Sequence, residues 1–379
     1  MDFTYDAEQV ALRDAVRALV GKAYGDFENR RRVVAADPGF DAVLWHGLAE
    51  MGVLGLPFAE ADGGSGAGPV EVAVVARELG RVLAPEPFLS SVVMAGGLVA
   101  AVGTDAQRAE VLGALSAGDR VLAFAHTEPG ARWTAAAAAV SAIRRDDGWL
   151  VTGTKEPVGH GARADQLVVS AVLPDGGTGL FLVDGSATGL TRQGYPLVDG
   201  GRAALVTFEG TPAEPLGEPS DRSADIERVL AGARIIAANE ALGAMEVALD
   251  TTVGYLGSRK QFGVTLSHFQ ALTFRAADMY VSLETTRSLV AWASMVLAEA
   301  PEQVIEAGSR VGLKVARAGR HIGLEAIQLH GGIGMTAEYS IGTYTAHLTA
   351  LEQLYGNGHE HLGRLVATVG DHTEVDPLE

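Results

Sequence analysis

The sequence predicts an α+β protein in which a helical first third precedes a β-rich middle and a helical last third. Apolar residues recur at helical spacing towards both ends of the chain, whereas short apolar runs broken by Gly, Asp and Pro fill the middle. We therefore expect a helical domain over residues 1–118, a β domain over residues 119–222 and a helical bundle over residues 223–379.

An amphipathic helix is expected at the start of the first domain. Within residues 7–20, Leu12 and Val16 fall on one side of the helix, and Arg13 and Arg17 fall on the other. Gly- and Pro-rich breaks separate the later helical patterns of this domain. Those patterns cover residues 41–51, 70–83, 91–102 and 105–115.

Short apolar runs bounded by turn-forming residues predict the strands of the middle domain. They cover residues 121–125, 149–152, 166–171, 179–183 and 203–208. A Pro- and Glu-rich link over residues 211–220 then leads to long helical patterns, which predict a bundle of four or more helices. These patterns cover residues 224–256, 269–300, 301–330 and 344 to about 366.

Composition excludes several classes of function. The 379 residues carry a formal net charge of −18 without a basic run, which argues against nucleic acid as a partner. The absence of cysteine excludes disulfides and thiolate metal sites and suits a reducing cytosol. The start of the chain carries no export signal, and no apolar run reaches the about 20 residues that span a membrane. We expect a cytoplasmic protein that binds neither nucleic acid nor membrane.

The histidines do not predict a metal site. His359 and His361 are two residues apart, so they would point away from each other on a helix. No cysteine or paired carboxylate accompanies them at the spacing of a hydrolytic metal site.

Two distant segments carry the clearest functional signal. Arg259-Lys-Gln-Phe-Gly263 offers an arginine suited to phosphate, and Gln328-Leu-His-Gly-Gly-Ile-Gly334 contains paired glycines that let the backbone approach a ligand. The alternative interpretation is structural: the first segment would be a basic helix end, and the second would be a Gly-rich turn between helices. Together they resemble the nucleotide-binding signatures of the acyl-CoA dehydrogenase family, flavoproteins that desaturate acyl thioesters. The resemblance extends locally from Met1 to roughly Val366 and implies a β-barrel-like middle domain and a C-terminal four-helix bundle.

The resemblance implies FAD as the cofactor. The family arginine, here Arg259, would meet the FAD pyrophosphate, and Gln328 with the Gly331-Gly332 turn would meet the adenosine half. In family members both segments face the flavin of a neighbouring chain. The implied cofactor-binding residues are Arg259, Gln261, Phe262, Gly263, Gln270, Gln328, Gly331, Gly332 and Thr127.

The family motifs beside the flavin ring are only partly kept. Thr127-Glu-Pro129 resembles the start of the loop Thr-Glu-Pro-x-x-Gly-Ser-Asp, but Gly130-Ala-Arg-Trp-Thr134 follows it. Gly153-Thr-Lys155 begins a second signature, in which Pro157-Val-Gly159 replaces Trp-Ile-Ser or Trp-Ile-Thr. Pro157 supplies neither an aromatic face nor a donor, and Gly159 has no hydroxyl. Either drift within a working site or a loss of ring binding accounts for these changes.

The family's catalytic base is missing at both of its usual positions. The base is commonly the Glu of an Ile-Tyr-Glu-Gly-Thr run, and the corresponding stretch here places Tyr355 at that position. In branched-chain members the base lies just ahead of a retained arginine, which aligns with Arg234 and leaves Ala233 at the base position. Tyrosine, with a reference pKa of about 10, is a poor base near neutrality.

Two carboxylates are candidate substitutes for the base. Glu352 lies one helical turn before Tyr355, and Glu240 lies two turns after Ala233 on the same face, so either could point into the cleft. A solvated surface carboxylate and an ion-pair or capping partner are the alternative interpretations of Glu352 and Glu240. Tyr355 itself could donate a hydrogen bond or could simply pack at a helix end.

The interpretation that we favour is a FAD-dependent α,β-desaturase subunit that acts on an acyl-CoA thioester. Some family members, including those that resemble steroid side-chain degraders, are heterotetramers in which one chain carries the base and the other completes the FAD site. The partner here would be a second acyl-CoA dehydrogenase-like subunit, and an electron-transfer flavoprotein is the acceptor that the family implies. The alternatives are an autonomous homotetramer with a displaced base and a non-catalytic scaffold.

Overall fold

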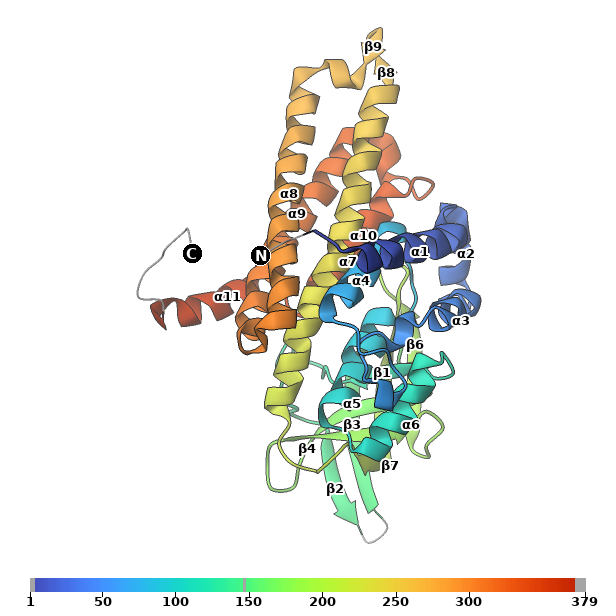
Figure 1. Ribbon diagram of the computed structural model, residues 1–379, viewed down its shortest axis with the longest axis vertical. Coiled ribbons are helices and arrows are strands. Elements are labelled where there is room, and N and C mark those ends of the chain that lie inside the picture. Colours follow the sequence, from blue (N-terminus) through green and yellow to red (C-terminus); the bar gives the residue numbers. More distant parts are fainter. Residues whose placement is uncertain (1–3, 146–147, 372–379) are drawn as a thin grey trace.

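The computed structural model describes residues 4–145 and 148–371 and arranges them along one long axis (Figure 1). The sheet lies toward one end of this axis, and two long helices extend to the other end. The Met1-Asp-Phe segment that belongs to the family resemblance lies outside the described residues.

The first part of the chain is helical, as predicted. Its first helix begins at Asp6, whose carboxylate accepts hydrogen bonds from the backbone of Glu8 and Gln9, and Thr104 caps the last one in the same way. The elements are α1 (Ala7–Tyr24), α2 (Phe27–Ala35), α3 (Ala42–Glu50), α4 (Pro69–Val82), α5 (Gly97–Val102) and α6 (Asp105–Ser116), with 3-10 turns at Val53–Gly55 and Glu60–Asp62.

Two features of this part differ from the prediction. The helix α2 was not predicted, because its Arg-rich sequence shows no apolar stripe and its anchor is the buried Arg30. The helix expected over residues 91–102 is instead a π-helical stretch, η3 (Phe88–Gly96), that runs into α5. Gly96 allows this packing, since a Cβ there would lie 2.6 Å from the ring of Phe58.

The middle part is a seven-stranded sheet that closes on itself. The strands β4, β2, β3, β7 and β5 pair in that order, and β5 pairs back to β4, with Val169 opposite Phe181. The strand β1 adds to β4, and β6 adds to β7. The strands are β1 (Leu122–Ala125), β2 (Ser141–Arg145), β3 (Gly148–Gly159), β4 (Gln166–Val172), β5 (Thr178–Asp184), β6 (Leu190–Pro196) and β7 (Arg202–Pro215).

The closed sheet has a core of Val151, Val169, Phe181 and Phe208, all almost fully buried. The strands β2 and β6 were not predicted, because their sequences are mostly polar and mostly exposed. Part of the segment expected to be a link, Thr211–Pro215, continues β7.

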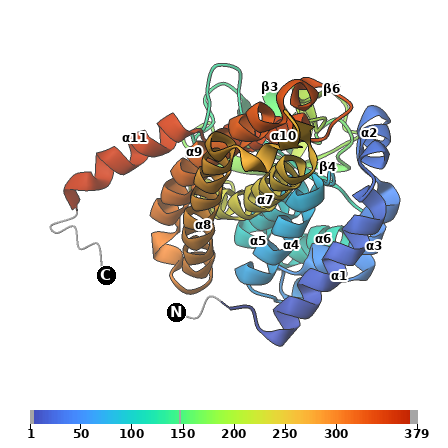
Figure 2. The same cartoon turned by 90° about the horizontal axis from the view of Figure 1, so that it is seen from above.

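Long helices form the last part. The helix α7 (Ser223–Ser258) leads through a short hairpin of β8 (Lys260–Gln261) and β9 (Val264–Thr265) to α8 (Gln270–Glu299). The remaining helices are α9 (Val304–His330), α10 (Ile341–Leu354) and α11 (Gly358–Thr368), with 3-10 turns at Leu266–His268, Pro301–Gln303, Gly331–Met335 and Val369–Asp371. Seen from above, α1 to α3 lie on one side of α7, and α8, α9 and α11 lie on the other (Figure 2). The predicted α+β fold with a β-barrel-like middle and a C-terminal bundle is therefore confirmed.

One predicted helix, residues 344–366, is wrong as a single element. The helix α10 ends at Tyr355, Gly356 takes a φ of 123°, and Asn357 then caps α11 by accepting hydrogen bonds from the backbone of His359 and Glu360. A positive φ favours glycine and a new N-cap restarts the chain in another direction, so the break follows from these two residues.

The crossing of α4 and α7 sets the position of Glu240. Gly80 of α4 packs on the backbone of Glu240, where a Cβ would lie 2.0 Å from the Glu240 carbonyl oxygen. Gly243 of α7 packs on Arg77 in the same way, at 2.0 Å from its carbonyl oxygen. Because glycine alone permits this approach, the pair of glycines holds Glu240 against the first domain. Within residues 4–145 and 148–371, no helix is long and apolar enough to cross a membrane.

Candidate functional site

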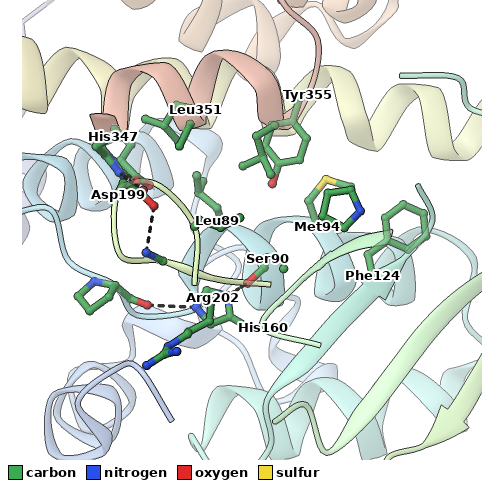
Figure 3. Close-up of a pocket in the computed structure, with 18 of the residues that line it drawn as sticks. Leu89, Ser90, Met94, Phe124, His160, Asp199, Arg202, His347, Leu351 and Tyr355 are labelled. Atoms are coloured by element: carbon green, nitrogen blue, oxygen red, sulfur yellow. Dashed lines mark hydrogen bonds and ion pairs between the residues drawn. The ribbon is translucent and has the colours of Figure 1, made fainter. Parts of the chain in front are cut away.

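A cavity of about 180 Å³ lies where the three parts of the chain meet (Figure 3). Its walls come from the segment around η3, from β1 and the segments that follow β3 and β6, and from α7 and α10. Its apolar lining includes Leu89, Met94, Phe124, Leu230, Leu351 and Leu354, and its polar lining includes Glu86, Ser90, His160, Asp199, Glu240, His347 and Tyr355.

A buried charged triad forms one wall of this cavity. His347 Nδ1 lies 2.9 Å from Asp199 Oδ2, and His347 Nε2 lies 2.9 Å from Glu240 Oε1. Burial alone would lower the pKa of His347, but the two carboxylates outweigh burial and raise it to about 9. The imidazole is therefore charged near neutrality, and Glu240 is an ion-pair partner of that charge, as in one of the interpretations of its sequence.

Of the two positions where the family keeps its base, Tyr355 lines the cavity, and Ala233 is next to Arg234, which contacts Tyr355. Tyr355 ends α10, and the Arg234 guanidinium donates a hydrogen bond of 2.7 Å to the Tyr355 carbonyl oxygen. Ala233, next to Arg234, belongs with Tyr355 to the same apolar core. The Tyr355 hydroxyl points into the cavity (Figure 3), and burial together with the Glu240 charge raises the pKa of Tyr355 far above its usual value. Tyr355 therefore stays protonated.

The two substitute carboxylates lie in different places. Glu240 lines the main cavity. Glu352 lies instead on a separate small cavity of about 30 Å³, together with Arg234 and His361. Glu352 does not line the main cavity, so the cavity gives no support to Glu352 as a substitute base.

The retained Thr-Glu-Pro and Thr-Lys segments are joined by a buried ion pair. Lys155 Nζ lies 2.8 Å from Glu128 Oε1 and also donates to Ser170 Oγ and to the His126 carbonyl oxygen. Glu128 further accepts hydrogen bonds from the backbone of residues 138–140. Burial lowers the pKa of Lys155 to about 8, and Glu128 offsets only part of that effect. These retained residues shape the loop, and Thr127 lines the cavity.

The altered residues fill the cavity differently. Pro157, Gly159 and His160 line it, and His160 takes a φ of 56°. The His160 ring bridges Ser90 Oγ at 2.8 Å and the Pro85 carbonyl oxygen at 3.1 Å, so it ties the end of β3 to the start of η3. At Gly159 a Cβ would meet only Ser90 Cβ, at 3.6 Å, so space for a side chain remains.

The hairpin of β8 and β9, which follows Arg259, lies at the end of the molecule away from the sheet (Figure 1). Tyr255, at the end of α7, stacks on His330, at the end of α9, with ring centroids 4.5 Å apart. This contact brings Arg259 and the Gly331-Gly332 turn to one end of the molecule. The side chains or backbone of Arg259, Gln261, Phe262, Gly263, Gln270, Gln328, Gly331 and Gly332 are all exposed there.

Two features of this end suit a phosphate-bearing ligand. Within the described parts of the chain, no side chain pairs with the Arg259 guanidinium, and no atom lies within 4 Å of a Cβ placed on Gly331 or Gly332. A free guanidinium and open backbone are what the dinucleotide part of FAD requires. These residues therefore fit the cofactor, and their exposure leaves the ligand accessible to a second chain.

Sequence reasoning missed several polar residues of the cavity, among them Glu86, Asp199, Ser90 and Arg202. Asp199 lies in the Gly-rich turn between β6 and β7, and Glu86 lies between Pro85 and Pro87 just before an apolar run. Each of Glu86 and Asp199 stands beside a short apolar run, and this pattern could have marked them as candidate buried carboxylates. No role was assigned to His347 from the sequence. In residues 4–145 and 148–371, no three metal-ligating side chains cluster as a metal site would require.

Comparisons with known proteins agree with this architecture. Models of the acyl-CoA dehydrogenase N-terminal, middle and C-terminal domains match residues 6–119, 123–207 and 224–368. The chain is 31% identical to the acyl-CoA dehydrogenase IpdE2 of Mycobacterium tuberculosis, over 96% of this chain and 97% of that protein. The chain therefore belongs to the acyl-CoA dehydrogenase family, whose members depend on FAD.

Solved structures of related proteins superpose along the whole chain. A variant of the Tcur3481-Tcur3483 steroid acyl-CoA dehydrogenase is 32% identical with a TM-score of 0.87, and covers 96% of this chain and 98% of its own. The ChsE4-ChsE5 complex from Mycobacterium tuberculosis is 26% identical with a TM-score of 0.88, and covers 99% of this chain and 100% of its own.

Proposed function

We propose that this chain is a subunit of a FAD-dependent acyl-CoA dehydrogenase that desaturates the α,β bond of an acyl-CoA thioester. In this proposal the other subunit of a heterotetramer carries the base, and this chain completes the FAD site. The observation that carries the proposal is that Tyr355 lines the cavity and Ala233 packs in the adjoining core, with no carboxylate at either position.

The remaining carboxylates of the cavity support the absence of a local base. Proton removal from the α-carbon requires a base with a free lone pair, and a carboxylate is the base that this family uses. Glu240 is held 2.9 Å from the His347 imidazolium, and Tyr24 donates a hydrogen bond of 2.5 Å to Glu86. Glu240 is therefore engaged by the imidazolium and Glu86 through its Oε1, and neither stands at a position where the family keeps its base, so the proposal assigns the base to the partner.

This chain's contribution to the cofactor is made at the exposed end of the bundle. FAD, when bound, supplies the acceptor for the hydride that leaves the β-carbon. Arg259 would hold its pyrophosphate, Gln328 and the backbone of Gly331 and Gly332 would hold the adenosine half, and Gln261, Phe262, Gly263 and Gln270 would complete that surface. Thr127 would lie beside the ring. All of these residues except Thr127 are exposed, which supports a site shared with a neighbouring chain.

The related structures support the heteromeric form. The names Tcur3481-Tcur3483 and ChsE4-ChsE5 each join two protein designations, and the first protein is called a steroid acyl-CoA dehydrogenase. We propose a fatty or steroid side-chain acyl group as the substrate, a second acyl-CoA dehydrogenase-like chain as the partner and an electron-transfer flavoprotein as the acceptor. The cytoplasm is the location that the sequence predicts.

The proposal is tested with the chain expressed alone and then with a candidate partner chain. Visible absorption measures bound flavin, native mass measures the oligomer, and acyl-CoA oxidation measures turnover. We expect flavin only in the mixed complex, at about one per pair of chains as the shared-site proposal requires. A chain that oxidises acyl thioesters alone at ordinary rates would contradict the proposal, and loss of that activity in Glu240→Gln would assign the base to Glu240.

A further inference from the structure

The Tyr355 hydroxyl opens onto the cavity and has no hydrogen-bond partner among the described residues. The side chain is 9% exposed, and its hydroxyl points into the cavity toward Leu89 and Met94 (Figure 3). Among residues 4–145 and 148–371, no group forms a hydrogen bond with this oxygen, whereas the Tyr344 hydroxyl nearby in α10 donates to the Arg81 carbonyl oxygen at 2.7 Å. A donor that opens onto a mostly apolar cavity without a protein partner is available to a polar group of a ligand.

The Glu86 carboxyl provides a second unused group in the same cavity. Its Oε1 accepts hydrogen bonds from the Tyr24 hydroxyl at 2.5 Å and from the Asp41 backbone at 3.1 Å. Its Oε2 is buried and has no hydrogen-bond partner within the described residues, although the residue is 94% buried and lines the cavity. The cavity therefore offers a free donor at Tyr355, and the Glu86 carboxyl in its wall holds an enclosed oxygen without a partner.

The rest of the lining defines what kind of ligand would use these groups. Leu89, Met94, Phe124 and Leu351 give the cavity an apolar body that suits hydrocarbon. A plain alkyl chain in this body would leave the Tyr355 hydroxyl and the Glu86 oxygen unsatisfied, which weakens binding. A hydroxyl group on the same hydrocarbon can accept a hydrogen bond from Tyr355 and can donate one to a carboxylate.

We propose that this cavity binds the acyl part of a hydroxylated acyl thioester and that Tyr355 is the residue that selects the hydroxyl. The thioester part of the ligand rests on the proposed function. At position 355 the family keeps a carboxylate base, which only accepts hydrogen bonds when it is ionised. Tyr355 can donate one, so in this chain the position would serve recognition of the ligand.

The test is a calorimetric titration of the full-length chain, alone and in its mixed complex. The ligands are octanoyl-CoA and its β-hydroxy, ω-hydroxy and β-oxo derivatives, so that the hydroxyl is compared with its absence and with a group that only accepts. We expect at least one hydroxylated ligand to bind about tenfold more tightly than octanoyl-CoA. In Tyr355→Phe this preference should fall to about onefold, since only the hydroxyl is lost.

The matched control is Tyr344→Phe, which removes a hydroxyl from the same helix outside the cavity and should keep the preference. Glu86→Gln is a second variant, which should reduce the preference even where Tyr355→Phe is poorly folded. Equal binding of all four ligands, a gain for the oxo ligand only, or a preference that survives in Tyr355→Phe would overturn the inference. The titration requires neither flavin nor turnover, so this failure is separate from the failure of the subunit proposal.

Discussion

His347 Nδ1 lies 2.9 Å from Asp199 Oδ2, and this contact joins α10 of the C-terminal bundle to the turn that follows β6 in the sheet. Arg30 of the first part extends the joint, because its guanidinium donates to the carbonyl oxygens of Leu83 and Asp199. All three parts of the chain are therefore held together at the cavity wall by hydrogen-bonded charges.

The first prediction concerns the pH dependence of this joint. The pKa of His347 is raised from its ordinary 6.5 to about 9, so the folded chain holds a proton that the unfolded chain releases between these values. The stabilisation by His347 is therefore complete below pH 6.5 and is lost as the pH rises through about 9. It amounts to about 3 kcal/mol at most.

Urea denaturation of the wild type and of His347→Gln between these pH values checks the prediction. Subtracting the two free energies of unfolding removes the contributions of other groups, including that of Lys155, whose lowered pKa acts in the opposite direction. We expect the difference to shrink as the pH rises. A difference that stays constant across this range would mean that His347 is uncharged in the folded chain.

The second prediction concerns Glu86. Burial raises the pKa of Glu86 from 4.5 to about 7, against the hydrogen bond from Tyr24. Between these pH values the unfolded chain loses a proton that the folded chain keeps, so this group makes stability fall as the pH rises. Glu86→Gln keeps an oxygen for Tyr24 and the Asp41 backbone but cannot ionise. We expect the variant to lack that fall, whereas Glu50→Gln, on the exposed end of α3, should retain it.

The third prediction concerns the buried Lys155–Glu128 pair, whose side chains are 0% and 3% exposed. Lys155→Met leaves a buried carboxylate without its cation and should lower the free energy of unfolding by about 3–5 kcal/mol. In Lys155→Met/Glu128→Gln the loss should be smaller than the sum of the two single losses by at least about 1 kcal/mol. Chemical denaturation measures all four proteins. The exposed Arg31–Glu28 pair is the control, with an expected coupling below about 1 kcal/mol; equal couplings for the two pairs would refute the argument.

The long helices and the order of the three parts were predictable because their apolar periodicity is strong. The patterns at residues 224–256 and 269–300 correspond closely to α7 and α8, since α7 is buried along most of its length and α8 keeps Met279, Leu283 and Val290 buried at helical spacing. The helix α2 and the strands β2 and β6 were not predictable, because tertiary contacts hold their mostly polar sequences in place.

The candidate site was only partly predictable, because its residues come from distant parts of the chain. The spacing of motifs brought attention to Tyr355, Ala233 and Glu240, and the fold places all three around one cavity or its core. No local pattern pairs Asp199 with His347, which are 148 residues apart. The direction of Glu352 depended on where α10 ends, and the break at Gly356 was not predicted.

The last prediction concerns the end of the bundle that carries Arg259. Arg259→Ala in the mixed complex should weaken flavin binding about 10- to 100-fold, because an arginine–phosphate contact contributes as a charge-assisted hydrogen bond. The exposed position of Arg259 predicts that the melting temperature of the chain alone stays unchanged. Flavin absorbance after dialysis at several flavin concentrations gives the affinity, and native mass shows whether the complex persists.

Arg144→Ala is the matched control, since Arg144 is an exposed arginine on β2, at the sheet end of the molecule. It changes the net charge by the same amount but should leave flavin binding unchanged. If both variants lose flavin equally, the effect belongs to overall charge. If neither does, Arg259 does not meet the cofactor, and the exposed end of the bundle serves assembly without FAD, which is the arrangement that a non-catalytic scaffold would have.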